Sequence, residues 1–265
     1  MLSAYSTLLR TAIHGSYAKT FREPGGALQH PFITPGSEQY TAELWDWDSW
    51  LFNVALRQIV LEQGDPAVRD QIRPYERGCI LNFLSCPGAS TGFIPICVNR
   101  DEFQWPEDIR HTNMHKPCLA QHAAFLVRED GGDAGWLRES FKALCSFINF
   151  YRNHHFHSAT GLYYWQDDYA IGVDNDPCTY GRPDKSSGSI YLNCLMSREL
   201  EEDARDLAEK TVDLFGRDLE RFGDFHEYYE PDNGKPVMNL GFHSWNLLVL
   251  NMLAWLEGKP VVAEF

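Results

Sequence analysis

Apolar residues recur at helical spacing along most of this 265-residue chain. Five apolar positions step by four, three, four and three residues, which places them on one face of a helix: Leu137, Phe141, Leu144, Ile148 and Tyr151. Similar patterns predict further helices at 3–19, 66–85, 117–129, 189–222 and 243–257, and through Trp47, Leu51, Val54 and Leu61. We therefore expect an all-α fold with about seven or eight helices and no β-rich half.

Three long connections, at 21–43, 87–115 and 158–188, are rich in glycine, proline and aromatic residues. Long ordered loops in a compact domain are usually functional, and these contain too many aromatic residues for disordered linkers. We expect a single helical domain over residues 1–265, with the loops gathered on one face and the functional site among them.

Composition restricts the partners and the compartment. The formal net charge of −14 argues against a nucleic-acid partner, because phosphates require a basic surface. Residues 1–20 lack the features of a signal peptide, and no stretch approaches eighteen consecutive apolar residues, so no membrane span is expected. The seven cysteines are odd in number and lack C-x-x-C spacing, which favours reduced thiols and a cytoplasmic protein.

The first segment with chemical potential is Leu44-Trp45-Asp46-Trp47-Asp48-Ser49-Trp50, at the start of a predicted helix. Tryptophan faces stack on the C–H-rich surfaces of sugar rings, and carboxylates accept hydrogen bonds from hydroxyl groups. The same residues are equally consistent with an acidic helix N-terminus and core tryptophans.

The second segment runs from Tyr163 to Pro177 and contains YYWQDDY and GVDNDP. Its four carboxylates within ten residues would repel one another in a semi-dry pocket. Such crowding raises the pKa of at least one of them, as a general acid requires. A solvated acidic turn is the simpler alternative, and the spacing does not match a calcium loop.

The third segment, FHEYYEPDNG at 225–234, leads to GFHSW at 241–245 and holds Glu227 between aromatic residues. Taken together, the segments suit an inverting glycosidase, which needs two carboxyl groups on opposite sides of the scissile bond with space for water. His154, His155 and His157 lack other ligands at metal spacing and are better explained by a polar helix end, so no metal is expected.

The run from Gly25 to Trp50, the GVDNDP segment and the HEYYEPDNGK…GFHSW terminus resemble glycoside hydrolase family 63. The likeness is closest to its bacterial members, which include mannosylglycerate hydrolases and other α-glycosidases. The family is similar in fold and mechanism to the trehalases. The resemblance therefore implies an (α/α)6 toroid that inverts the anomeric centre without a cofactor.

The resemblance also implies roles for individual residues. Asp174 matches the general acid, and Glu227 matches the general base with Glu230 as a rival. The substrate-binding residues that it implies are Trp45, Trp47, Asp48, Gln121 and Trp245. Trp165 and Arg182 are also predicted to bind substrate, because they lie near Asp174 in the sequence. Arg182 could pair with a substrate carboxylate such as glycerate, or with one of the neighbouring aspartates.

The chain departs from the family near Glu202–Ala208, where relatives continue into further hairpins and a Tyr-Trp-Arg-Gly-type stretch. Either the toroid is reduced and open, or a segment is absent from this sequence. The predicted function is hydrolysis of a small α-glycoside, such as mannosylglycerate, glucosylglycerate or a short α-glucoside. The alternatives are a sugar epimerase, which would normally use histidine pairs, and a non-catalytic sugar-binding protein.

Overall fold

The computed structural model describes residues 2–109, 112–159, 162–172, 180–187, 204–229 and 236–262. These ranges contain seven α-helices: α1 (Leu2–Ser16), α2 (Asp46–Gln63), α3 (Pro66–Leu84), α4 (Leu119–Glu129), α5 (Phe141–His154), α7 (Ala204–Phe222) and α8 (Val249–Leu256). Short 3-10 helices are η1 (Tyr17–Thr20), η2 (Gly135–Leu137), η3 (Tyr169–Ile171) and η4 (Trp245–Leu248). The described residues are therefore rich in helix but not all-α. The segment expected to be helical from 189 is described only from Ala204 onward.

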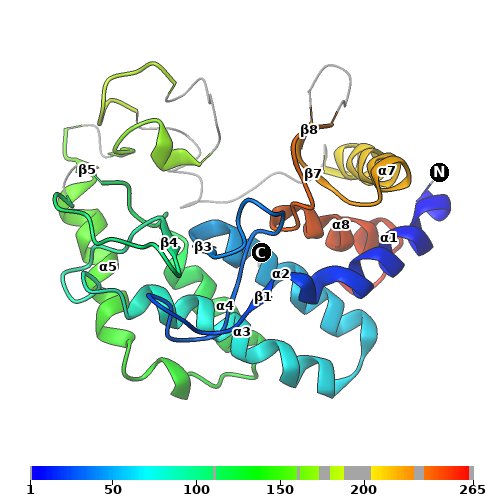
Figure 1. Ribbon diagram of the computed structural model, residues 1–265, viewed down its shortest axis with the longest axis horizontal. Coiled ribbons are helices and arrows are strands. Elements are labelled where there is room, and N and C mark those ends of the chain that lie inside the picture. Colours follow the sequence, from blue (N-terminus) through cyan, green and yellow to red (C-terminus); the bar gives the residue numbers. More distant parts are fainter. Residues whose placement is uncertain are drawn as a thin grey trace.

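Four antiparallel two-stranded sheets add a β component that the sequence patterns did not predict. They pair β1 (Phe21–Arg22) with β2 (Phe32–Ile33), β3 (Glu43–Trp45) with β4 (Cys97–Asn99), β5 (Phe156–His157) with β6 (Leu162–Tyr163), and β7 (His226–Tyr229) with β8 (Pro236–Leu240). The β3–β4 sheet joins the predicted loops 21–43 and 87–115. In Figure 1, β5, β7 and β8 lie in the upper half, and β3 and β4 lie near the middle, above α3 and α4.

A Gly-Asp-Pro sequence connects α2 to α3. Gly64 ends α2 with φ 64°, the left-handed conformation that glycine adopts without steric cost. The Asp65 side chain then accepts a hydrogen bond from the Ala67 amide, and Pro66 occupies the first turn of α3, where its missing N–H is not needed. These three residues turn the chain so that α2 and α3 pack against each other.

The buried face of α5 differs from the predicted one. Phe141 and Ile148 are 61% and 44% exposed, whereas Phe147 and Phe150 are buried together with Leu144 and Tyr151. The buried stripe is therefore rotated, because Phe147 packs against the His115 ring and Phe150 against the Phe93 ring. Leu61, predicted on the buried face of α2, is likewise exposed near the end of that helix.

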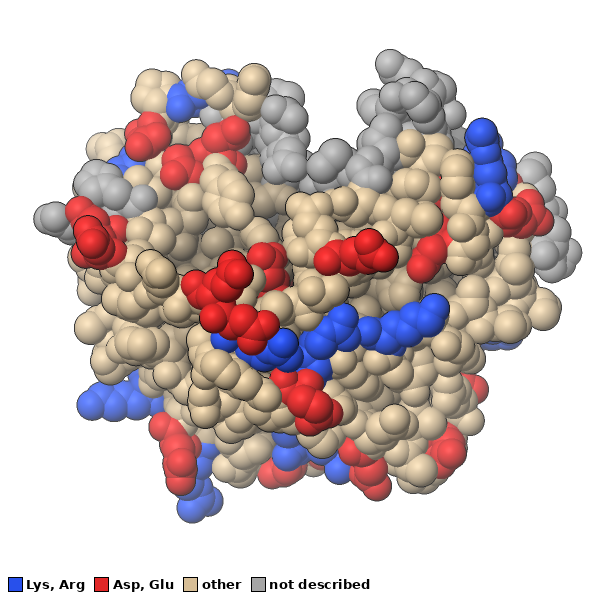
Figure 2. Space-filling view, viewed as in Figure 1, with Lys and Arg blue, Asp and Glu red and all other residues tan. Residues whose placement is uncertain are grey.

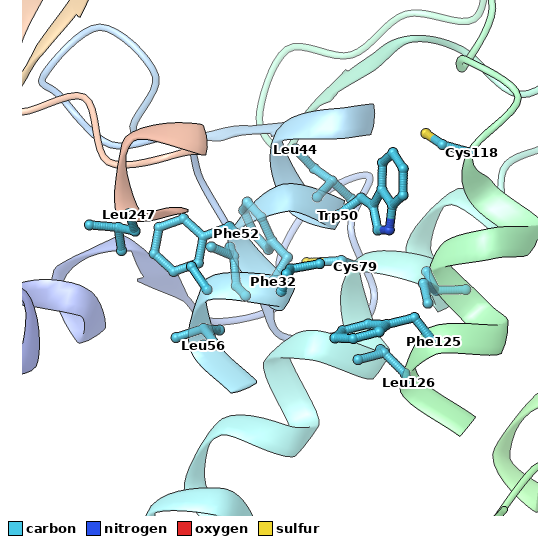
Figure 3. Packing of buried hydrophobic residues seen from close by; sticks show 14 of the residues in the cluster. Phe32, Leu44, Trp50, Phe52, Leu56, Cys79, Cys118, Phe125, Leu126 and Leu247 are labelled. Carbon is cyan, nitrogen blue, oxygen red and sulfur yellow. The ribbon is translucent and has the colours of Figure 1, made fainter. Parts of the chain in front are cut away.

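The core lies around α2, which packs against α3, α4 and α8. Figure 3 shows side chains from α2, α3, α4 and the adjoining segments meeting there: Phe32, Leu44, Trp50, Phe52, Leu56, Cys79, Cys118, Phe125, Leu126 and Leu247. The terminal helices also meet, because α1 packs against both α7 and α8 (Figure 1). Contacts between the first and last helices connect the two ends of the chain through one core.

A buried ion pair joins three helices beside this core. Arg57 of α2 donates from Nε and Nη2 to the two Glu76 carboxylate oxygens of α3, at 2.8 and 2.6 Å. Arg57 Nη2 also lies 3.1 Å from Asp130, the residue that follows α4. Arg69 and Arg77 of α3 donate to the same aspartate. The buried charges are therefore paired in a bidentate geometry, which the low dielectric of the interior requires.

The sequence predicted that the chain has no membrane span and that its cysteines are reduced. Within the described ranges, no helix combines the length and apolarity needed to cross a bilayer. Cys79, Cys86, Cys97, Cys118 and Cys145 are free thiols, and Cys178 and Cys194 lie outside the described residues.

Candidate active site

The first predicted segment, Leu44–Trp50, forms the N-terminal end of α2. Trp45 ends β3 in an extended conformation, and Asp46, Trp47 and Asp48 make the first helical turn. Both aspartates are buried, and their carboxylates lie where the positive end of the helix dipole favours negative charge. Trp45 Nε1 donates to Glu43 Oε2 at 2.7 Å, and this hydrogen bond holds the indole at the N-terminal end of α2.

Asp46 binds a lysine that the sequence patterns did not single out. The Lys116 backbone N–H donates to Asp46 Oδ2 at 2.8 Å, and Lys116 Nζ lies 3.2 Å from both carboxylate oxygens. The ammonium group also lies 4.7 Å from the centre of the Trp47 ring, at cation–π distance. Lys116 is fully buried, and the polar sequence around it, HTNMHKPC, gives no local signal for a buried charged partner.

Asp48 connects this turn to the last predicted segment. Ser244 Oγ donates to Asp48 Oδ1 at 2.6 Å, which joins residues 196 positions apart in the sequence. Burial raises the pKa of the Asp48 carboxyl to about 7, against the effect of the Ser244 hydrogen bond, which favours the ionised form. Near neutral pH this carboxyl can therefore either donate to or accept from a hydroxyl group.

The second predicted segment reaches the same place through Gly172 and Tyr169. A Cβ on Gly172 would lie 2.8 Å from Lys116 Nζ and 3.7 Å from the Trp47 ring. The Tyr169 ring centre is 6.3 Å from that of Trp45. Asp174, two residues beyond Gly172, lies outside the described residues. The second segment therefore contacts the turn from Trp45 to Asp48 through Gly172 and Tyr169, and the third contacts it through Ser244. The β7–β8 hairpin that carries Glu227 is not part of these contacts.

Glu227 belongs to β7, and its backbone lies at an irregularity of the β7–β8 ladder. His226 pairs with Leu240 and Tyr228 with Val237, so the register shifts at the residue between them. Two steps along β7 oppose three along β8, so the extra residue of this bulge belongs to β8, and Glu227 is the single residue opposite it. The Glu227 side chain and the whole of Glu230 lie outside the described residues.

The remaining predicted residues have varied environments. Trp165 is buried against Ala170 and Ile171, so it packs within the segment before Asp174. Gln121 is exposed in the first turn of α4, where its amide donates to the Pro117 carbonyl at 3.5 Å. Arg182 is exposed. Trp245 begins η4, and its side chain is outside the described set.

A cavity of about 570 Å³ lies elsewhere, lined by Thr91, Glu107, Asp108, Ile109, Phe150 and His154. It contains none of the predicted site residues, so its size does not mark the site. His154 is the last residue of α5, as a polar helix end requires. The described residues include no group of three or more His, Cys, Asp or Glu side chains suited to a metal ion. Figure 2 shows acidic and basic side chains adjoining each other across the middle of one face.

Gly172 provides a test of this geometry. Its φ of 70° is unfavourable for any other residue, and a methyl group would displace the Lys116 ammonium from Asp46. We expect Gly172→Ala to lower the free energy of unfolding by about 2–4 kcal/mol in urea denaturation. Gly181 is the matched control, because it has φ 68° and a Cβ added there would meet nothing within 4 Å. Gly181→Ala should cost about 1 kcal/mol, and equal losses would contradict the packing of Gly172 on Lys116.

His115 predicts how stability depends on pH. It is fully buried between Phe83 and Phe147, and burial lowers its pKa to about 4. Below pH ~6.5 the unfolded chain gains a proton here that the folded protein does not bind. The stability contribution is therefore complete near pH 7 and falls by about 3 kcal/mol as the pH drops to about 4. Urea denaturation at both pH values should show a loss about 3 kcal/mol greater in the wild-type protein than in His115→Asn. Equal losses would contradict a neutral buried imidazole.

Comparison with models of known protein families found no match for this chain, and comparison with curated protein sequences found none either.

Proposed function

We propose that this protein is an inverting α-glycosidase of the family 63 type, with Asp174 as general acid and Glu227 as general base. Asp174 would protonate the leaving oxygen, and Glu227 would activate a water on the opposite face of the sugar ring. No cofactor takes part in this reaction. The substrate class is a small α-glycoside such as mannosylglycerate, glucosylglycerate or a short α-glucoside.

The observation that carries the proposal is the contact of distant segments around Trp45–Asp48. Ser244 binds Asp48, and Gly172 packs on Lys116 and Trp47. Each of these partners lies close in sequence to a proposed functional residue: Ser244 precedes Trp245, and Gly172 precedes Asp174 by two residues. Trp45 and Trp47 are partly exposed, as stacking on a pyranose ring requires, and the buried Asp46 and Asp48 carboxyl groups fix the turn that carries them.

We also propose that the helices belong to an (α/α)6 toroid. In such a ring, inner helices contact one another and alternate along the chain with outer ones. Support comes from α2, which contacts both α4 and α8, and from α1, which closes on α7 and α8. A crystal structure in which α2, α4 and α8 do not surround a common axis would contradict this architecture.

A cytoplasmic location is proposed from the cysteines. Free thiols at five described positions fit a reducing compartment. Titration of the denatured protein, purified under conditions that block thiol exchange, should find all seven cysteines reduced. A protein whose thiols are paired in disulfides would contradict the proposed location.

A substrate screen followed by product NMR tests the proposed activity. The panel contains mannosylglycerate, glucosylglycerate, trehalose and short α-glucosides. The proposal predicts release of a free sugar from at least one of them. Formation of an isomer without bond cleavage would instead indicate an epimerase, and shifted resonances without product would indicate a binding protein.

A further inference from the structure

The β7 strand is fixed by side chains at the residue immediately before Glu227. Asp218 of α7 is 4% exposed, and its Oδ2 accepts a hydrogen bond from the His226 backbone N–H at 3.0 Å. His226 Nδ1 lies 3.1 Å from both carboxylate oxygens of Asp218. A carboxylate accepts hydrogen bonds, so Nδ1 is assigned as the protonated ring nitrogen. One buried aspartate thus holds both the main chain and the side chain of His226.

Asn246 of η4 holds the other side of the same residue. Its Nδ2 donates to the His226 carbonyl oxygen at 2.7 Å and to the Phe242 carbonyl oxygen at 2.8 Å. The His226 carbonyl belongs to the peptide group that joins His226 to Glu227. A hydrogen bond to this oxygen restrains the rotation of that peptide plane, and with it the φ angle of Glu227. Asn246 is itself 2% exposed, so its position is fixed by packing.

The ladder of a two-stranded sheet could not provide this restraint alone. An isolated two-stranded hairpin is only marginally stable, and the bulge in β8 makes the ladder irregular opposite Glu227. A catalytic base must nevertheless be held to within a fraction of an ångström, because a displacement of about 1 Å can cost about 100-fold in rate. The side-chain hydrogen bonds to the His226 N–H and carbonyl add a restraint on β7 next to this irregular part of the ladder.

We infer that Asp218, His226 and Asn246 form a clamp that positions Glu227 as the base of the reaction. This inference rests on the proposed function. The three residues are positioning residues, since they act on the backbone that carries Glu227. Their loss should impair the chemical step more than substrate binding, because the restrained group acts on the attacking water.

The Asp218→Asn variant, assayed on the best substrate of the panel, tests the clamp. We expect kcat to fall about 10–100-fold with KM within about twofold of wild type. Hydrogen exchange of the β7 amides should accelerate at the same time. Asp213→Asn is the matched control, because it makes the same change on the same helix, where Asp213 pairs with the exposed Arg217. The control should retain wild-type kcat and exchange rates.

Two substitutions of His226 keep the test decisive if Asp218→Asn folds poorly. His226→Asn retains a donor near the Nδ1 position and should keep most of the turnover. His226→Leu removes the donor, and its kcat should fall about as far as that of Asp218→Asn. If Asp218→Asn and His226→Leu retain kcat within about threefold while Glu227→Gln is inactive, the clamp is wrong and the proposed function stands. If Glu227→Gln itself retains turnover, the base assignment fails, and the clamp fails with it.

Discussion

Glu227→Gln and Asp174→Asn are each expected to lower kcat about 1000-fold on the best natural α-glycoside, with the folded structure retained. The general base and the general acid each assist a proton transfer in the same transition state, so the loss of either raises the barrier to bond cleavage. Steady-state kinetics measure the loss, and circular dichroism with thermal unfolding checks the fold.

The leaving group separates the two roles. A glycosyl fluoride needs little protonation on departure, so Asp174→Asn should recover much of its activity on that substrate, whereas Glu227→Gln should not. Asp176→Asn and Glu230→Gln are matched controls from the same two segments and should retain most of the turnover. A large loss in Glu230→Gln with normal activity in Glu227→Gln would transfer the base role to Glu230. Wild-type turnover in both Asp174→Asn and Glu227→Gln would refute the proposed mechanism.

Arg57→Leu is expected to destabilise the protein by about 3–5 kcal/mol. The substitution removes the guanidinium that pairs with Glu76 at 2.6 and 2.8 Å, and leaves a carboxylate in an environment without access to water. Burial raises the pKa of Glu76 to about 7 even beside Arg57, so without Arg57 the carboxyl group either stays charged or takes up a proton. Both outcomes cost free energy because no solvent replaces the lost partner. Urea denaturation at pH 7 measures the change in the free energy of unfolding.

Arg217→Leu is the control for this prediction. Arg217 forms an exposed pair with Asp213 at 3.1 Å on α7, where water screens the charges. Its loss should cost less than about 1 kcal/mol. Similar losses in the two variants would show that the Arg57–Glu76 pair is not a buried junction between α2 and α3.

The sequence predicted the helices well because their signals are local. Apolar spacing and the Gly-Asp-Pro turn lie within a few residues of the structure they specify, as for α2 and α3. The predicted faces were less accurate, since the choice between Ile148 and Phe147 depends on which neighbours α5 meets. The short sheets escaped prediction for the same reason. Trp45 pairs with Cys97, and two to five residues on each strand are too few to give a periodic pattern.

In the candidate site, too, the residues of a local motif were predicted, and those that depend on long-range contacts were not. Trp45, Trp47 and Asp48 were predicted from a compact motif, and the structure joins this motif to residues close to the other segments. Lys116 was missed because a lysine becomes a buried functional candidate only when its partner is known, and Asp46 lies 70 positions away. Ser244 lies in the GFHSW sequence, but its role toward Asp48 depends on a contact over 196 positions. Long-range pairing of polar groups is set by the fold and leaves no trace in local spacing.

The anomer released first from an α-glycoside tests the central claim most directly. Proton NMR spectra, recorded in the first minutes of hydrolysis and before mutarotation, distinguish the two anomeric protons of the product. Hydrolysis by water activated at Glu227, on the face opposite to Asp174, predicts that the β-anomer appears first and the α-anomer follows only by mutarotation. Initial release of the α-anomer would show retention and would contradict the assignment of Asp174 and Glu227 as an inverting pair.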